Sequence, residues 1–142
     1  MKNKLMQSVP LVIALVGVGF AHFSYWCMYS YGVCYSNWVS HIYQYFTNPF
    51  YNFSLYLLPL TIILVLISRP IFNSWLKLAV WAVPLSIIFI ASNPVTSGGF
   101  MDLYPFYRDD AARLAAQVLT VVSFLLIGWK YLKSRNGNLR TS

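Results

Sequence analysis

Hydrophobic residues in this chain form four long runs separated by short polar breaks. The runs cover approximately residues 9–31, 53–68, 75–92 and 111–132. A helix needs roughly 20 apolar residues to cross the hydrocarbon core of a bilayer, so each run is close to the length of one membrane span. The pattern predicts an all-α integral membrane protein, folded as an antiparallel bundle of four transmembrane helices.

Polar residues and prolines mark the ends of these runs. Arg69-Pro70 follows the second run, and Asn93-Pro94 follows the third. Because proline cannot donate the backbone hydrogen bond that continues a helix, we expect helices to end there, with a tight turn at Asn73-Ser74 before the third span. The predicted outer loops are residues 32–52 and 93–110, and residues 133–142 form a polar cytoplasmic tail.

The composition supports a single membrane domain over residues 1–142. Hydrophobic residues make up 58% of the chain and charged residues only 9%, and no charged residue occurs between Lys4 and Arg69. Four spans use most of the 142 residues, so no length remains for a separate soluble domain.

Lysine and arginine are unequally divided between the two sides of the predicted bundle. Eight lie at the ends that we place inside, and two lie in the second outer loop. The positive-inside rule therefore predicts that both chain ends are cytoplasmic, in a bacterial inner membrane. It also accounts for the net charge of +7 without a nucleic-acid partner. The inside residues are Lys2, Lys4, Arg69, Lys77, Lys130, Lys133, Arg135 and Arg140, and the outside residues are Arg108 and Arg113.

An alternative interpretation treats the segment from Met1 to Ala21 as a cleaved signal peptide. Lys2 and Lys4 precede an apolar run, and small residues near Ala21 suit a cleavage site. Three spans would then remain. We favour a first span, because the apolar run continues past Ala21.

Small residues in the first run predict a close helix contact. Gly17 and Ala21 are four residues apart, so they lie on the same face of a helix. Such a small-x-x-x-small pair lets another helix approach closely, within the chain or in an oligomer. We expect the intramolecular use.

Aromatic residues are concentrated around the first outer loop, where 15 of the 26 lie between Phe20 and Tyr56. Tyrosine and tryptophan favour the headgroup region of a membrane, so an interfacial belt is the simplest explanation. Polar and apolar residues also alternate at helical spacing over residues 37–47, which predicts a short amphipathic helix lying flat on the outer leaflet. Alternatively, Trp38 and His41 in this segment belong to a surface that binds a partner.

The two cysteines, Cys27 and Cys34, both fall near the outer end of the first span. The outer side of a bacterial inner membrane is oxidising, so a structural disulfide is the favoured interpretation, ahead of buried free thiols. Their spacing is not that of a C-x-x-C redox motif, which makes thiol chemistry the weakest alternative.

The second outer loop carries the densest group of charges. We expect Asp109 or Asp110 to cap the fourth helix, and Asp109 to pair with Arg113 at i,i+4. A further hypothesis assigns an outer recognition surface to this loop, because aromatic and arginine side chains make good interface anchors. Its members are Asp102, Tyr104, Tyr107 and Arg108, with Trp38 and His41 from the first loop.

No motif in the chain indicates catalysis or a cofactor. His22 and His41 do not form the facing pair that haem b uses in a membrane bundle, and the cysteines and histidines lack metal-ligand spacing. The chain has no phosphate-binding loop, no G-x-S-x-G and no H-E-x-x-H. We therefore expect a protein that is not an enzyme, with no cofactor and no metal.

By elimination, the sequence favours a non-enzymatic protein that acts through protein contacts in the membrane and at its outer face. In topology, the chain resembles accessory subunits of envelope complexes. It also resembles the small four-helix immunity proteins that protect bacteria against pore-forming toxins. A small oligomeric transporter is a third alternative. The expected partners are the lipid bilayer and either another membrane protein or further copies of this chain.

Overall fold

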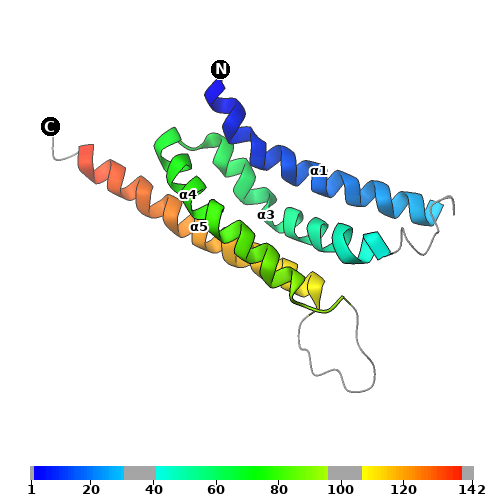
Figure 1. The fold of residues 1–142 in the computed structure, drawn as a ribbon. Coiled ribbons are helices and arrows are strands. Elements are labelled where there is room, and N and C mark those ends of the chain that lie inside the picture. Colours follow the sequence, from blue (N-terminus) through cyan, green and yellow to red (C-terminus); the bar gives the residue numbers. More distant parts are fainter. Residues whose placement is uncertain (1, 31–40, 96–106, 139–142) are drawn as a thin grey trace.

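We analysed a computed structural model of the chain, which describes residues 2–30, 41–95 and 107–138. All the secondary structure in these ranges is helical, and four helical segments are long and apolar enough to cross a membrane (Figure 1). The predicted all-helical fold with four candidate spans is therefore confirmed. The elements are α1 (Lys2–Ser30), η1 (Tyr43–Thr47, a π-helix), α3 (Asn48–Leu66), α4 (Arg69–Ala91) and α5 (Arg108–Asn138).

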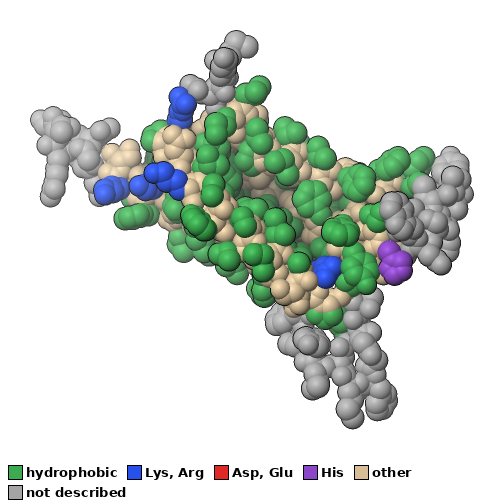
Figure 2. All heavy atoms as spheres, viewed as in Figure 1, with side chains coloured by type: hydrophobic (Ala, Val, Ile, Leu, Met, Phe, Trp, Pro, Cys, Tyr) green, Lys and Arg blue, Asp and Glu red, His purple; other side chains and the backbone are tan. Residues whose placement is uncertain are grey.

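The helices run alternately up and down, so both chain ends lie at the same end of the molecule (Figure 1). We call this end, where α1 begins, α3 connects to α4 and α5 ends, the terminal end. The opposite end, where α1 and α4 end and where η1 and α5 begin, is the loop end. Figure 2 shows lysine and arginine side chains gathered at the terminal end, with apolar side chains covering most of the face between the two ends.

Helix α3 occupies the centre of the packing. Both α1 and α5 pack along α3, and α4 packs along α5. Helix α1 therefore lies at the edge of the bundle and leaves side chains such as Val16 and Phe20 more than half exposed. In a membrane these side chains contact lipid or another protein, and neither contact requires a polar surface.

Small side chains permit the contact between α1 and α3. Ala14, Gly17 and Ala21 are buried on one face of α1. A Cβ atom added to Gly17 would overlap the hydroxyl of Ser54 and lie 2.8 Å from Cε1 of Phe50, both on α3. The predicted close approach at Gly17 is confirmed, and it occurs within the chain.

A buried apolar cluster joins α3 to α4 near their connection. Within this cluster, the indole nitrogen of Trp75 donates a hydrogen bond of 3.0 Å to the hydroxyl of Ser123 on α5, and both side chains are buried. This pairing satisfies the polar atom of a large core side chain and connects α4 to α5. The cluster consists of Leu60, Leu64, Phe72, Trp75 and Ala79.

The predicted start of the third span is wrong, because a proline can start a helix as well as end one. Pro70 lies in the first turn of α4, where its missing N–H is not needed, and Ser68 precedes it in an extended conformation. The backbone carbonyl of Ser68 accepts from the N–H groups of Ile71 and Phe72. The turn between the second and third helices is therefore at Ile67 and Ser68, and the predicted turn at Asn73-Ser74 lies inside α4.

The second membrane helix also begins earlier than predicted. Residues 41–47 continue directly into α3, so the candidate span covers Tyr43–Leu66 rather than starting near residue 53. The described part of the predicted flat helix is thus the first part of this span. A π-helical turn precedes Pro49, and such a turn accommodates a residue that cannot form the regular α-helical bond.

Helix α5 is longer at both ends than the fourth apolar run. It begins at Arg108 and continues to Asn138, so the described part of the predicted polar tail is helical. Hydropathy locates only the apolar part of a helix, and backbone hydrogen bonds can continue the helix into the polar residues beyond it.

Candidate interaction site at the loop end

Four elements meet at the loop end: η1, the first turn of α3, the last turn of α4 and the first turns of α5. Their polar side chains form a connected set of contacts, which we call the loop-end junction. Its members are Tyr45, Asn48, Asn52, Arg108, Asp109, Asp110 and Arg113.

Arg108 is bound to the backbone of two other elements. Its Nε donates to the carbonyl of Asn93 at 3.2 Å, and one terminal nitrogen donates to the carbonyl of Ala91 at 3.1 Å. These carbonyls end α4 and have no partner further along that helix. A positive charge there is also favoured by the negative end of the helix dipole. Arg108 therefore caps α4 from the first residue of α5.

The remaining nitrogen of Arg108 donates to the carbonyl of Tyr45 in η1 at 3.4 Å. Pro49 follows Tyr45 by four residues and has no N–H, so this carbonyl lacks its α-helical donor. The guanidinium supplies a replacement, which explains why an arginine is suited to this position.

The ring of Tyr45 lies close to two residues that the sequence singled out. The Arg108 guanidinium carbon is 5.4 Å from the centre of the Tyr45 ring, and the His41 ring centre is 5.8 Å from it. Tyr45 is 42% exposed and its neighbour Phe46 is 71% exposed. The structure thus forms an aromatic surface held in place by an arginine, as a cation–π contact allows.

Below this surface, two asparagines on α3 bind the first turns of α5. The Asn48 amide donates to the carboxylate of Asp109, and the Asn52 amide donates to the backbone carbonyl of Asn48 at 3.0 Å. Nε of Arg113 donates to the Asn52 side-chain oxygen at 3.1 Å. Asn52 is buried, so this bond satisfies a group that would be costly to leave unpaired.

The ion pair of Arg113 differs from the predicted one. Its guanidinium lies 3.7 Å from the carboxylate of Asp110, three residues earlier, whereas Asp109 is bound to Asn48. The prediction of an Asp109–Arg113 pair is therefore corrected. The spacing i,i+4 permitted that pair, but α3 packs beside Asp109 and offers it a closer donor. Both aspartates remain in the first turn of α5, where the helix dipole favours negative charge.

The other predicted site residues fall partly within the described ranges. Tyr107 accepts a backbone hydrogen bond of 2.8 Å from Ala111, which begins α5. Cys27 is disulfide-bonded. The remaining residues, Cys34, Trp38, Asp102 and Tyr104, lie outside the described residues.

Sequence reasoning did not identify Tyr45, Asn48 or Asn52. A signal was present for the asparagines, because Asn48 and Asn52 are four residues apart beside a long apolar run. That spacing places two amides on one helix face at the edge of the membrane, where they need polar partners.

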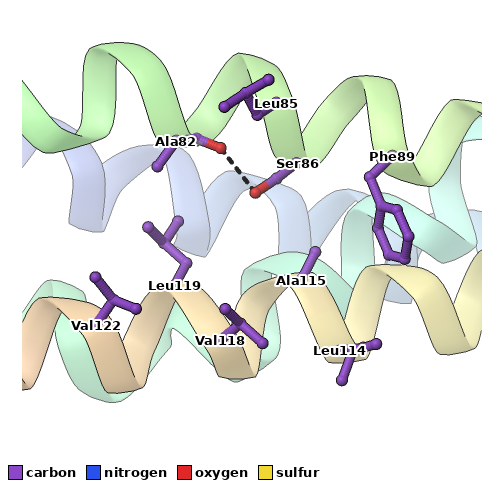
Figure 3. Close-up of a pocket in the computed structure, with 9 residues that line it drawn as sticks. All are labelled: Ala82, Leu85, Ser86, Phe89, Leu114, Ala115, Val118, Leu119 and Val122. Carbon is purple, nitrogen blue, oxygen red and sulfur yellow. Dashed lines mark hydrogen bonds between the residues drawn. The ribbon is translucent and has the colours of Figure 1, made fainter.

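An apolar groove begins beside the junction and runs between α4 and α5 (Figure 3). Its volume is about 360 Å³. Phe89 from α4 reaches toward α5 at the loop end of the groove, and Leu114 lies opposite on α5 (Figure 3). The Ser86 hydroxyl donates to the Ala82 carbonyl of its own helix at 2.8 Å, so it offers no free donor to an occupant. The other lining residues are Leu85, Ala115, Val118, Leu119 and Val122.

Among the residues that the structure describes, no three of histidine, cysteine, aspartate or glutamate lie close enough together to hold a metal ion. The charged groups of the junction are engaged with one another, with asparagine side chains or with backbone carbonyls. Comparison of the chain with protein-family models, with curated proteins and with solved structures gave no match.

Proposed function

We propose that this chain is a non-enzymatic, multi-pass protein of the bacterial inner membrane, with both ends cytoplasmic, that binds another membrane protein as an accessory subunit of an envelope complex. The observation that carries the proposal is the groove between α4 and α5, which opens beside the loop-end junction. An occupant of the groove would therefore meet an apolar surface within the membrane and aromatic side chains at its edge.

The lining of the groove favours a helix as its occupant. Ala82 and Ser86 on α4 and Ala115 on α5 are small, and small side chains let a helix backbone approach closely within a membrane. Leucine, valine and phenylalanine side chains around them provide the apolar contact. Because the Ser86 hydroxyl already donates within its own helix, it needs no hydrogen-bond acceptor from the occupant, which suits an apolar transmembrane helix.

The junction would provide specificity where the partner leaves the membrane. Tyr45 and Phe46 present exposed aromatic surface, and aromatic residues on a fixed framework are typical anchors of protein interfaces. Arg108 holds Tyr45 in place by its contacts to the ring and the carbonyl. Each of its three nitrogens donates to a backbone carbonyl, so we assign Arg108 a positioning role rather than direct contact with a partner.

The test is photocrosslinking from within the groove in native membranes. A photoreactive amino acid at Val118, which lines the groove, should form an adduct with a second protein of defined mass. The same amino acid at Leu125 is the matched control, because Leu125 lies on α5 and is exposed but does not line the groove. Mass spectrometry of the adduct identifies the partner.

Three results would overturn the proposal. Absence of any protein adduct from Val118 would leave lipid as the occupant. Equal adducts from Val118 and Leu125 would indicate random collisions in the membrane. An adduct consisting of this chain alone would indicate a homo-oligomer and replace the accessory role by an oligomeric one.

A further inference from the structure

We infer that the terminal end of α5 carries a binding site for the headgroup of an anionic phospholipid, formed by Lys130, Lys133 and Trp129. The ammonium nitrogen of Lys130 lies 5.7 Å from the Trp129 ring centre, and that of Lys133 lies 5.9 Å from it. Two positive charges are therefore held around one indole ring, which is 63% exposed. This site is independent of the proposed partner groove.

The chain itself provides no nearby countercharge for these lysines within the described ranges. The sequence has no acidic residue after Asp110. Since a helix rises 1.5 Å per residue, Asp110 lies about 30 Å along α5 from Lys130. That distance is almost four times the screening length at physiological salt, roughly 8 Å. The one salt bridge among the described residues, Asp110–Arg113, is at the opposite end of the bundle.

The helix dipole of α5 does not account for the stabilisation of both lysine charges. Its favourable effect on cations is limited to the last turn of a helix, and α5 continues to Asn138. Lys130 thus lies about two turns before the end. Contacts with the Trp129 ring orient the ammonium groups without neutralising them. An external anion is required for neutralisation.

The surface beside the lysines favours a lipid over a soluble anion. Val121, Leu125 and Trp129 follow one another at intervals of four residues on α5, and each is more than 50% exposed. Lys133 continues this face four residues after Trp129. A phospholipid can therefore lay an acyl chain along the apolar strip and place its phosphate between the two lysines, with the indole at the headgroup level.

Other cations at the terminal end enlarge the positive field but lack this arrangement. Lys4 is in the first turns of α1, and Lys77 is in the third turn of α4. No aromatic contact to the ammonium group of either residue is recorded among the described residues. They provide a charge-matched control for a site that depends on geometry.

The experiment is native mass spectrometry of the purified full chain in mild detergent, with equal amounts of phosphatidylglycerol and phosphatidylcholine. We expect the phosphatidylglycerol adduct to predominate. A lysine near a membrane surface contributes about a five-fold preference for anionic lipid, so the double variant Lys130→Gln, Lys133→Gln should lose that preference by at least this factor. The double variant Lys4→Gln, Lys77→Gln should keep most of it. Trp129→Leu, which retains the charges, should give an intermediate value.

Two outcomes would overturn the inference. If the two double variants lost preference equally, total charge rather than this site would govern lipid binding. A competition with inorganic phosphate at constant ionic strength separates the two sources of phosphate. Phosphate should leave the lipid adduct unchanged, and efficient displacement would show that the lysines bind a soluble anion instead. Circular dichroism of each variant confirms that it remains folded.

Discussion

The two ends of this bundle use positive charge in opposite ways. At the loop end, Arg108 and Arg113 are bound by carbonyls, an amide and a carboxylate of the protein. At the terminal end, Lys130 and Lys133 contact only a tryptophan ring among the recorded interactions of the described residues. The first arrangement joins helices together, and the second is open to the surroundings.

The difference follows from what each end must satisfy. At the loop end, Pro49 and the end of α4 leave backbone carbonyls without helical donors, and a guanidinium has several donors in fixed directions. At the terminal end, α3 and α4 are joined by a short connection with its own backbone hydrogen bonds. No guanidinium is needed there, so the lysines remain available to lipid.

The largest expected effect tests the close contact between α1 and the first turns of α3. We expect Gly17→Ala to lower the free energy of unfolding by about 2 kcal/mol, because its methyl group would overlap Ser54 and crowd Phe50. Gly128→Ala, in α5, is the matched control, since an added Cβ there meets nothing within 4 Å. It should be neutral or stabilise by up to about 1 kcal/mol through helix propensity.

Unfolding of both glycine variants is measured by circular dichroism in mixed detergent micelles. Equal destabilisation by the two substitutions would contradict the difference in packing. A neutral Gly17→Ala would show that α1 can move away from α3 without cost.

The second prediction compares the loss of stability on replacing Arg108, which binds backbone carbonyls, with that on replacing Lys130, which has no recorded hydrogen bond among the described residues. Arg108→Met should destabilise the fold by roughly 1.5 kcal/mol, because it removes the donors to three carbonyls, which are partly hydrated at the loop end. Lys130→Met removes the same charge and should change stability by less than about 0.5 kcal/mol. Parallel unfolding titrations of the two variants make the comparison. If Lys130→Met were more destabilising than Arg108→Met, the loop-end arginine would not be the cation that holds the helices together.

The smallest effect concerns the one buried side-chain pair recorded between α4 and α5. Ser123→Ala leaves the buried indole N–H of Trp75 without its acceptor and should cost about 1 kcal/mol. Ser86→Ala removes a hydroxyl that bonds within its own helix, so it should be close to neutral. A double-mutant cycle with Trp75→Phe measures the coupling, and additive effects of the two substitutions would show that the pair contributes nothing.

Hydrophobicity predicted the existence of the spans well and their boundaries less well. An apolar run of about 20 residues has few alternatives to a membrane helix, so four spans could be predicted from the positions of the apolar runs. Pro70 misled the boundary assignment, because it lies at the start of α4, where no N–H is required. Whether a proline ends or begins a helix depends on where the chain turns in space.

The candidate site was only partly accessible from the sequence. Arg108 and His41 were expected in a binding surface, and the structure places both beside Tyr45, although their role with a partner stays a prediction. The sequence predicted that Arg113 pairs with Asp109, whereas in the structure it pairs with Asp110. Local spacing lists the pairs that one helix allows, whereas the neighbouring Asn48 on α3 decided which aspartate was available.

The sequence by itself determined that this chain has four helices able to span a membrane and that its cations are concentrated near the two chain ends and the α3–α4 connection. Both follow from the cost of placing polar groups in lipid, which depends on residue type alone. Tertiary structure decided that Gly17 packs against Ser54, that Arg108 caps α4, and that a groove opens between α4 and α5. These features depend on which helix faces meet, because the bilayer excludes polar groups but does not specify how apolar helices pair.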